Sequence, residues 1–492
     1  FGGLRREVEF RQRNLRHSNE SRFSIHQKQI AMEKAIEIIE KEKAFTSTRN
    51  ACKVCTPLGG SIVFKGIEGC VPLIHGSQGC ATYIRRYLIS HYKEPVDIAS
   101  TNFTEETAIF GGEKNLFIAI KNVTEQYNPK IIGIATTCLS EVIGDDMRKI
   151  IHKYKTENEG NPNLPELVFV NTPSFMGTHI NGFHDTVLSL VKAFATQNQV
   201  AHSLNVFPGF LSPADLQLLK EIFEDVAINA IMVPDYSDIL DNEYTGEYEK
   251  LPKGGTTIQE LQDTACAKAS LEFGYILNKS NPNSQSAAEF LESDFDVPRI
   301  NLNIPIGIKA TDAFFEALEK LTNKKTPEKY AKQRGKLVDA YVDGHKYVFG
   351  KKAVVYGEED FVIAMIAFLE EIGIETVLCA SGGDSGLLKT VIQEKINPRT
   401  DILIHDNFDF EEIATVCKEL KPDILIGNSK GYYIARELGI PLARVGFPIH
   451  DRLGGARIKH IGYEGTQQLF DMIANILIQQ MQDHSPVGYK YM

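Results

Sequence analysis

Three cysteines occur in sequence contexts that suit the binding of an inorganic cluster. Cys55 precedes a proline- and glycine-rich segment that includes Gly59, and Cys80 directly follows Gly79. Cys138 follows an apolar run. Thiolates are the usual ligands of iron–sulfur clusters, and glycine lets the backbone approach the sulfides closely. We therefore predict that these three thiols ligate metal and that the two glycines adjoin the same cofactor.

Several polar residues near these cysteines have both a structural and a functional interpretation. Ser174 follows a Thr-Pro pair at the end of a predicted strand, where serine caps a helix or forms a turn. Alternatively, its hydroxyl lies beside the cluster. His75 and His179 either donate hydrogen bonds to sulfide or are ordinary satisfied polar residues. Cys52 forms a Cys-x-x-Cys pair with Cys55, but a zinc ribbon needs a second such pair, which is missing. The other thiols are predicted to lie in the core: Cys70, Cys266, Cys379 and Cys417.

The sequence lacks the signatures of several common enzyme classes. It contains no Gly-x-x-x-x-Gly-Lys-Ser/Thr phosphate-binding loop. No pattern supports a Ser-His-Asp or Cys-His hydrolytic arrangement. We therefore predict no catalytic side chain in this chain. A metal-free α/β binding protein stays open as an alternative, and it predicts that the purified protein holds no iron.

The sequence around the cysteines alternates between strand and helix patterns. Ile131–Thr137 is a short apolar run typical of a buried parallel strand, and Cys80 opens a helical pattern over Ala81–His91. Asp145 and Asp146 are expected to cap a helix. The alternation continues to the end of the chain and predicts parallel sheets covered by helices on both faces. Sites in such sheets lie at the carboxyl ends of strands, where we expect the thiols to converge.

We expect an α/β protein with three doubly wound, Rossmann-like parallel-sheet modules and an N-terminal helical arm. The arm covers residues 1–45, and the cluster-binding module covers 46–200. The second module, 201–345, ends in bridging helices, and the third, 346–492, ends in a C-terminal helix. The length of 492 residues suits this division, since a domain has roughly 150 residues.

Composition and charge exclude several protein classes. The net charge of −11, from 53 Lys and Arg against 64 Asp and Glu, disfavours nucleic-acid binding, which needs a basic face. No apolar run approaches the roughly 20 residues that a membrane-spanning helix needs. The 8 cysteines are too sparse for a disulfide scaffold, so we expect a reducing, cytoplasmic location.

Several motifs resemble the β-type subunits of the nitrogenase component 1 superfamily. The similarity covers nearly everything from residue 46 onward. It is carried by His75-Gly-Ser-Gln-Gly-Cys80, Phe110-Gly-Gly112, Thr136-Thr-Cys138, Glu141-Val-Ile-Gly-Asp-Asp146, Thr172-Pro-Ser-Phe175 and Gly446-Phe-Pro448. The resemblance implies that Cys55, Cys80 and Cys138 match the three β-side thiolates of a subunit-interface cluster. It also implies that Ser174 matches a serine that can bind this cluster when oxidised.

Two branches of this family are similar to the chain. The more similar is NifN, the β-like half of the NifEN scaffold for iron–molybdenum cofactor maturation in nitrogen fixation. This similarity lies in residues 50–59, 64–69, 83–91, 451–455, 462–468 and 484–489. The alternative is the β subunit of the nitrogenase molybdenum–iron protein, which binds the P-cluster and reduces dinitrogen with its α partner.

The resemblance also implies a cofactor and partners. The cofactor is an iron–sulfur cluster, either 4Fe–4S or P-cluster-like 8Fe–7S, which relays electrons and is shared with an α-like subunit. That subunit is NifE in the scaffold branch and the nitrogenase α chain in the catalytic branch, in an α2β2 heterotetramer. Further implied partners are the nitrogenase iron protein and NifB.

Overall fold

Three parallel β-sheets organise the chain in this computed structural model. The structure describes residues 32–34, 52–197, 203–244, 246–279 and 284–488. The strand orders are β2-β1-β3-β4, β6-β5-β7-β8 and β11-β10-β9-β12-β13. Each sheet comes from one stretch of the chain, which confirms the predicted α/β class with three parallel-sheet modules. The predicted arm lies outside the described residues except for 32–34, which are helical.

The first module contains the sheet that carries the predicted ligands. Strands β1 and β3 pair in parallel along their whole length, from Cys70 opposite Ile131 to His75 opposite Thr136. Both strands therefore end at the same edge of the sheet. The elements are α2 (Thr56–Lys65), β1 (Cys70–His75), α3 (Gln78–Tyr92), β2 (Ala99–Ser100), α4 (Glu105–Phe110), α5 (Glu113–Tyr127), β3 (Ile131–Thr136), α6 (Cys138–Ile143), α7 (Met147–Glu157), β4 (Glu166–Val170) and α8 (His179–Phe194).

The second module follows, with two helices that lead to the third. Its elements are β5 (Leu204–Phe207), α9 (Pro213–Asp225), β6 (Ala230–Met232), α10 (Ile258–Asp263), β7 (Ser270–Phe273), α11 (Ala287–Phe295), β8 (Arg299–Leu302), α12 (Ile308–Thr322) and α13 (Glu328–Val348). Ser212 caps α9 by accepting the N–H of Asp215, and Pro213 occupies the first turn, as the sequence suggests. Between α12 and α13, Asn323 adopts a left-handed conformation and Pro327 precedes the next helix.

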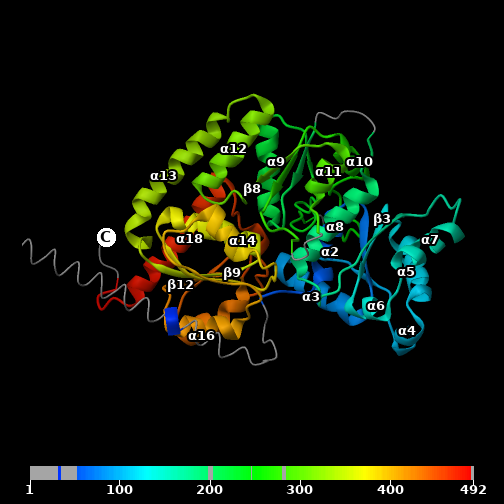
Figure 1. Cartoon of the computed structure of the whole chain (residues 1–492), viewed down its shortest axis with the longest axis horizontal. Coiled ribbons are helices and arrows are strands. Elements are labelled where there is room, and N and C mark those ends of the chain that lie inside the picture. The colour runs from blue at the N-terminus through cyan, green and yellow to red at the C-terminus, as the bar shows by residue number, and fades with distance from the viewer. Residues whose placement is uncertain (1–31, 35–51, 198–202, 245, 280–283, 489–492) are drawn as a thin grey trace, which may run out of the picture.

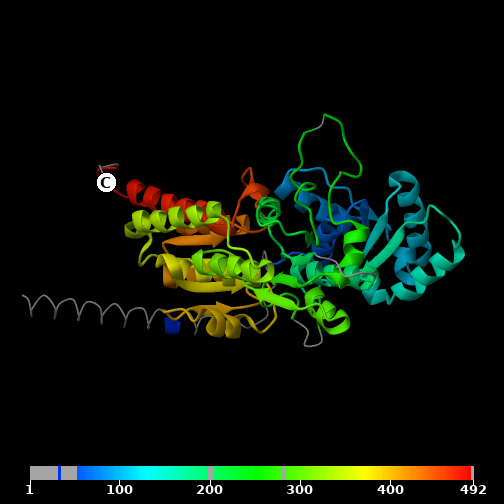
Figure 2. The same ribbon diagram turned by 90° about the horizontal axis from the view of Figure 1, so that it is seen from above.

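The third module has a five-stranded sheet and the C-terminal helix. Its elements are β9 (Lys352–Gly357), α14 (Glu359–Ile372), β10 (Glu375–Ser381), α15 (Leu388–Val391), β11 (Leu403–His405), α16 (Phe410–Leu420), β12 (Ile424–Gly427), α17 (Tyr432–Leu438), β13 (Leu442–Arg444) and α18 (Gly462–Asp483). In Figure 1 this module lies at the left and the first module at the lower right, with the second module above and between them. Figure 2 shows α13 and α18 side by side at the outer end of the third module. No helix in the described parts of the chain has both the length and the apolar character needed to span a bilayer.

Buried polar groups join the three modules. Asp360 of α14 accepts the three consecutive N–H groups of 275–277, after β7, at 2.6, 2.9 and 2.7 Å. His179 of α8 meets Glu358 at 3.1 Å. The cavities left beside these contacts are small, with volumes of about 30 and 10 Å³. The joint between the modules is therefore closed at these contacts.

Two glycines bring α2 and α8 into close contact. A Cβ on Gly59 would lie 1.8 Å from the carbonyl oxygen of His179, and one on Gly182 would lie 2.0 Å from that of Thr56. The glycine-rich segment after Cys55 is thus a fully buried helix. In this position Gly59 has a packing role, and its contact with a cofactor stays a prediction.

Candidate metal centre

Each predicted thiol ligand lies at the start of a helix in the first module. Cys55 is the N-cap residue of α2, Cys80 lies in the first turn of α3, and Cys138 is the first residue of α6. The N-cap of α3 is Ser77, whose hydroxyl accepts the N–H of Gly79 at 3.1 Å. Helices α3 and α6 follow neighbouring strands, so the parallel sheet brings their first turns to the same edge.

Ser174 connects two of the thiol-bearing segments. Its N–H donates to the Sγ of Cys138 at 3.2 Å, and its Oγ accepts the N–H of Thr56 at 3.2 Å. The hydroxyl of Thr56 donates to the carbonyl of Gly177 at 3.1 Å. The loop after β4 therefore holds the first turn of α2, and with it Cys55, beside Cys138.

The thiol of Cys80 interacts electrostatically with the other two thiols. Burial raises the pKa of the Cys80 thiol, and the neighbouring thiols of Cys55 and Cys138 raise it further. All three thiols are free and only partly buried. Bound metal would reverse the effect on Cys80, since a cation stabilises the thiolate.

The donor set suits a cluster rather than a single ion. Among the residues that the structure describes, no three His, Cys, Asp or Glu side chains converge closely enough to hold one metal ion. A set of three thiols is the donor chemistry of iron–sulfur clusters, which span more widely spaced sulfurs. The partial exposure of the thiols leaves one side for ligands from another chain. The residues present therefore fit one half of an iron–sulfur site.

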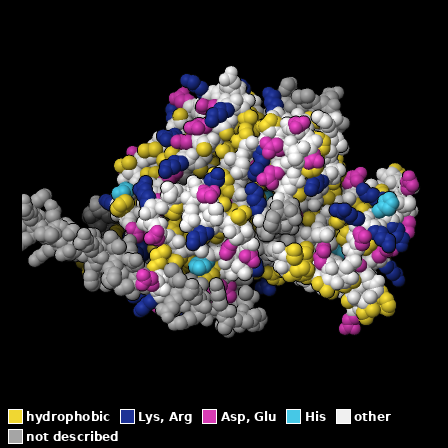
Figure 3. Space-filling model, in the orientation of Figure 1, with side chains coloured by type: hydrophobic (Ala, Val, Ile, Leu, Met, Phe, Trp, Pro, Cys, Tyr) yellow, Lys and Arg dark blue, Asp and Glu magenta, His cyan; other side chains and the backbone are white. Residues whose placement is uncertain are grey.

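Large apolar side chains are exposed on the elements that carry the thiols and on α4. They come from α3, α4, α6 and the loop after Ser174: Tyr83, Ile109, Phe110, Leu139, Val142, Phe175 and Met176. Figure 3 shows hydrophobic side chains gathered over α4 at the lower right. Exposed apolar patches of this kind are typical of protein–protein interfaces. The sequence analysis missed this surface, because apolar residues in short helices resemble core residues when no tertiary contacts are known.

The histidines and the remaining cysteines have structural positions. His75 is fully buried, and its Nε2 lies 3.1 Å from the Oδ2 of Asp145. His179 pairs with Glu358 of the third module. Cys52 packs into the core of the third module. Three of the other thiols are buried as predicted: Cys70, Cys379 and Cys417. The core position predicted for Cys266 is wrong, because this thiol is partly exposed.

Asp145 has a role that the sequence analysis did not find. Asp146 caps α7 as expected, by accepting the N–H of Lys149 at 3.1 Å. The carboxylate of Asp145 instead accepts the N–H of Gly112 at 3.1 Å, in addition to its contact with His75. It therefore fixes the break between α4 and α5 against the end of β1. The sequence signal for this contact was the Gly-Gly pair in an otherwise helical region.

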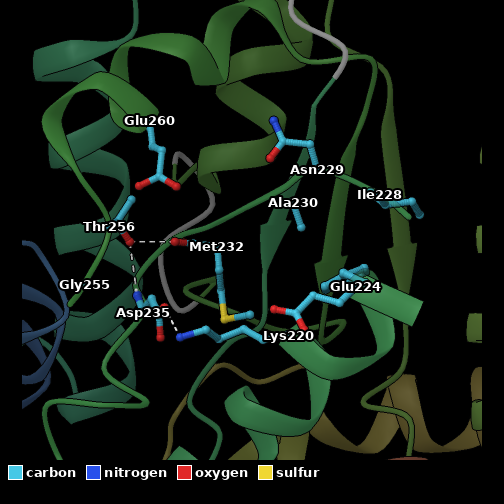
Figure 4. A pocket seen from close by; sticks show the side chains of 11 residues that line it. Lys220, Glu224, Ile228, Asn229, Ala230, Met232, Asp235, Gly255, Thr256 and Glu260 are labelled. Carbon is cyan, nitrogen blue, oxygen red and sulfur yellow. Dashed lines mark hydrogen bonds and ion pairs between the residues drawn. The ribbon is translucent and has the colours of Figure 1, made fainter. Parts of the chain in front are cut away.

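A separate cavity lies beside the edge strand β6 of the second module (Figure 4). Its volume is about 240 Å³. Lys220 meets Asp235 at 3.0 Å and Asp238 at 2.7 Å, and the hydroxyl of Thr256 donates to the carbonyl of Met232. No cysteine or histidine lines this cavity. It therefore lacks the donors that the thiol site offers.

Comparisons with known proteins agree with the fold. Residues 55–478 match the family described as Nitrogenase component 1 type Oxidoreductase. The chain is 36% identical over 440 residues to the nitrogenase molybdenum-iron protein beta chain of Clostridium pasteurianum, covering 88% of this chain and 94% of that protein. It is 33% identical over 444 residues to the protein of the same name from Methanothermobacter thermautotrophicus, again with 88% and 94% coverage. A solved structure, nitrogenase Cp1 at pH 6.5, has a TM-score of 0.86 at 34% identity and covers 92% of this chain and 98% of that chain.

Proposed function

The chain belongs to the nitrogenase component 1 type oxidoreductase family, and on this premise we propose that it is a β-type subunit that shares an iron–sulfur cluster with an α-type partner. The main support is the arrangement of three free, partly exposed thiols at one edge of the sheet. The helices and the loop at this edge also expose large apolar side chains. A chain that offers half of a ligand set next to an apolar surface is suited to assembly with a second chain that supplies the rest.

In this proposal, Cys55, Cys80 and Cys138 are the metal ligands. An iron–sulfur cluster supplies one-electron transfer, and the chain supplies position and electrostatics. The N-terminal turn of α3 directs its positive dipole end toward the thiolate of Cys80. The N–H of Ser174 donates to the sulfur of Cys138 and orients it. Gly79 is exposed, and a Cβ added there would meet only the Oγ of Ser77, at 3.5 Å, so this position leaves space for a cofactor.

The comparisons favour the catalytic branch of the family. The curated relatives named above are beta chains of the nitrogenase molybdenum-iron protein. We therefore propose first that the chain pairs with a nitrogenase α chain, receives electrons from the nitrogenase iron protein and relays them through a P-cluster-like 8Fe–7S cluster. A cytoplasmic α2β2 assembly belongs to the same proposal.

The second candidate is the NifN scaffold subunit, which pairs with NifE and receives the cofactor precursor from NifB. It is favoured by the stretches that resemble NifN, among them 83–91 in α3 and 451–455 before α18. In that case the shared cluster is a 4Fe–4S cluster, for which Cys80 is the ligand from this chain.

Anaerobic purification with the co-expressed partner chain separates these candidates. The catalytic branch predicts an interface cluster of eight irons that is EPR-silent in dithionite, together with acetylene reduction at nitrogenase rates. The scaffold branch predicts four irons per interface and no such activity. Purified complex without iron would refute both candidates.

The ligand assignment has its own test. Replacement Cys80→Ala should remove the interface cluster, because the thiolate that it deletes belongs to the proposed ligand set. Cys266→Ala is the matched control, since this partly exposed thiol belongs to the second module, where it donates to the carbonyl of Thr196 at 3.5 Å. Iron content and visible absorption should fall in the first variant and stay at the parental level in the second. Full iron content in Cys80→Ala would overturn the assignment.

A further inference from the structure

The carboxylate of Asp145 connects three segments of the first module. Its two oxygens each accept the N–H of Gly112 at 3.1 Å, and its Oδ2 lies 3.1 Å from the Nε2 of His75. Asp145 itself follows α6, whose first residue is Cys138. The segment after α6, the end of β1 and the start of α5 therefore meet at one side chain, and Figure 1 shows α4, α5 and α6 together in this part of the module.

These contacts lie close in sequence to two of the predicted ligands. His75 ends β1, and two residues join it to α3, which carries Cys80 in its first turn. The hydroxyl of Thr137, directly before Cys138, donates to the carbonyl of His75 at 3.2 Å. The segment 137–145 thus holds His75 at two points, the backbone carbonyl and the ring. The position of Cys80 relative to Cys138 depends on both contacts.

The side chains around Gly112 are tightly packed. A Cβ on Gly112 would lie 2.6 Å from the Oδ2 of Asp145, 2.7 Å from the Cε1 of His75 and 2.4 Å from the Cζ of Phe103. Real Cβ atoms essentially never come within 3.0 Å of a neighbour. The ring of Phe103 also packs edge-on against that of His75, with 4.9 Å between the centroids. Packing as well as hydrogen bonding therefore holds the carboxylate against the imidazole.

The hydrogen bonds of Asp145 require a carboxylate. The ring of His75 is fully buried, and its Nδ1 has no hydrogen-bond partner within the described ranges. Because an ionised carboxylate only accepts, the Nε2 of His75 carries the hydrogen, and Asp145 fixes the tautomer of the ring. The N–H of Gly112 contacts both carboxylate oxygens, so an amide at this position would turn its NH₂ group toward that N–H in either orientation.

We propose that Asp145 is a positioning residue for the iron–sulfur cluster: it sets the relative position of Cys80 and Cys138, and with it the midpoint potential of the cluster. The inference rests on the proposed function, since it needs a cluster at these thiols. Among the residues that the structure describes, no hydrogen bond joins Asp145 to either thiol, so it acts through His75 and the backbone. Reduction potentials of iron–sulfur clusters depend on the hydrogen bonds and the exposure of their sulfurs, which change when a ligand segment moves.

Anaerobic redox titration of the intact complex, with its co-expressed partner chain, tests this role. Asp145→Asn should displace the midpoint potential from the parental value and alter the EPR spectrum of the oxidised cluster. Gly112→Ala should do the same with every charge retained, and its backbone, at φ −92°, accepts alanine without strain. Asp146→Asn is the matched control, because it removes the same charge at the exposed neighbour that only caps α7, where asparagine also serves as a cap. It should keep the parental potential and spectrum.

Two replacements of His75 separate positioning from general loss of structure. His75→Gln keeps an N–H donor for Asp145 and should stay close to the parental potential, whereas His75→Leu removes the donor and should be displaced. Loss of the cluster from Asp145→Asn, in a complex that circular dichroism shows to be folded, would also support the proposal, because ligands out of place do not bind.

Three results would overturn the role of Asp145. They are parental potentials and spectra in Asp145→Asn and Gly112→Ala, an equal displacement in Asp146→Asn, and equal potentials in His75→Gln and His75→Leu. The last comparison decides the question if Asp145→Asn does not fold. A parental complex without iron would instead refute the proposed function and this inference with it, whereas an iron-containing parent with unchanged variants would refute only the inference.

Discussion

Replacement Gly59→Ala tests how the α2–α8 contact positions Cys55. The added Cβ would lie 1.8 Å from the carbonyl oxygen of His179 and 2.7 Å from the N of Phe183. Ordinary contact begins at 3.4 Å, so the two helices must separate by about 1.6 Å. These neighbours are backbone atoms, which cannot rotate away. Overpacking of this kind costs up to about 3 kcal/mol, whereas alanine gains about 1 kcal/mol in helix propensity.

The net destabilisation is therefore about 2 kcal/mol, and it has a functional consequence. Cys55 caps α2, so the same displacement moves its sulfur by more than the roughly 0.5 Å that a preorganised ligand set tolerates. Thermal denaturation followed by circular dichroism should show a melting temperature lower by about 4–8 °C, if the first module unfolds as a unit. Anaerobic iron analysis should show reduced iron per chain.

Gly335→Ala is the matched control for Gly59→Ala. Gly335 lies inside α13, and a Cβ there would meet no atom within 4 Å. This variant should gain about 0.5–1 kcal/mol and keep its full iron content. An unchanged melting temperature and parental iron content in Gly59→Ala would show that the helices can separate without moving Cys55, which would refute the reasoning.

Two further predictions concern the joint between modules. Burial raises the pKa of Glu359 from 4.5 to about 7, so the contribution of this carboxyl to stability is greatest below pH 4.5 and is lost as the pH rises toward 7. Glu359→Gln should therefore reduce the loss of stability between pH 5 and pH 8 by about 2–3 kcal/mol in urea denaturation, and an unchanged pH dependence would contradict this. Asp360→Ala leaves three buried N–H groups without their acceptor and should cost about 3–6 kcal/mol in the same assay, whereas a cost below 1 kcal/mol would show that water replaces the carboxylate.

The sequence predicted the strands and helices that have strong local signals. The apolar run at Ile131 is β3, and the Ser-Pro pair at Ser212 starts α9. It did not predict α2, because Gly59 and Gly60 disfavour helix by propensity. These glycines allow α2 to pack closely against α8, and this tertiary contact outweighs their low helix propensity.

The candidate site was predictable in part. The glycine-rich stretch before Cys80 and the strand before Cys138 pointed to one sheet edge, and the structure places both thiols there. The link from Ser174 to the first turn of α2 joins positions 118 residues apart, which no local pattern encodes.

The closed joint at Asp360 has a consequence for how such a protein works. The buried contacts of Asp360 and of His179 with Glu358 leave cavities of only about 30 and 10 Å³ beside them, so the three modules meet there in a stiff joint. In the proposed electron relay, a joint of this kind relaxes little when an electron arrives or departs, which favours fast transfer. On the same proposal, the timing of transfer is set by the binding and release of other chains at the surface.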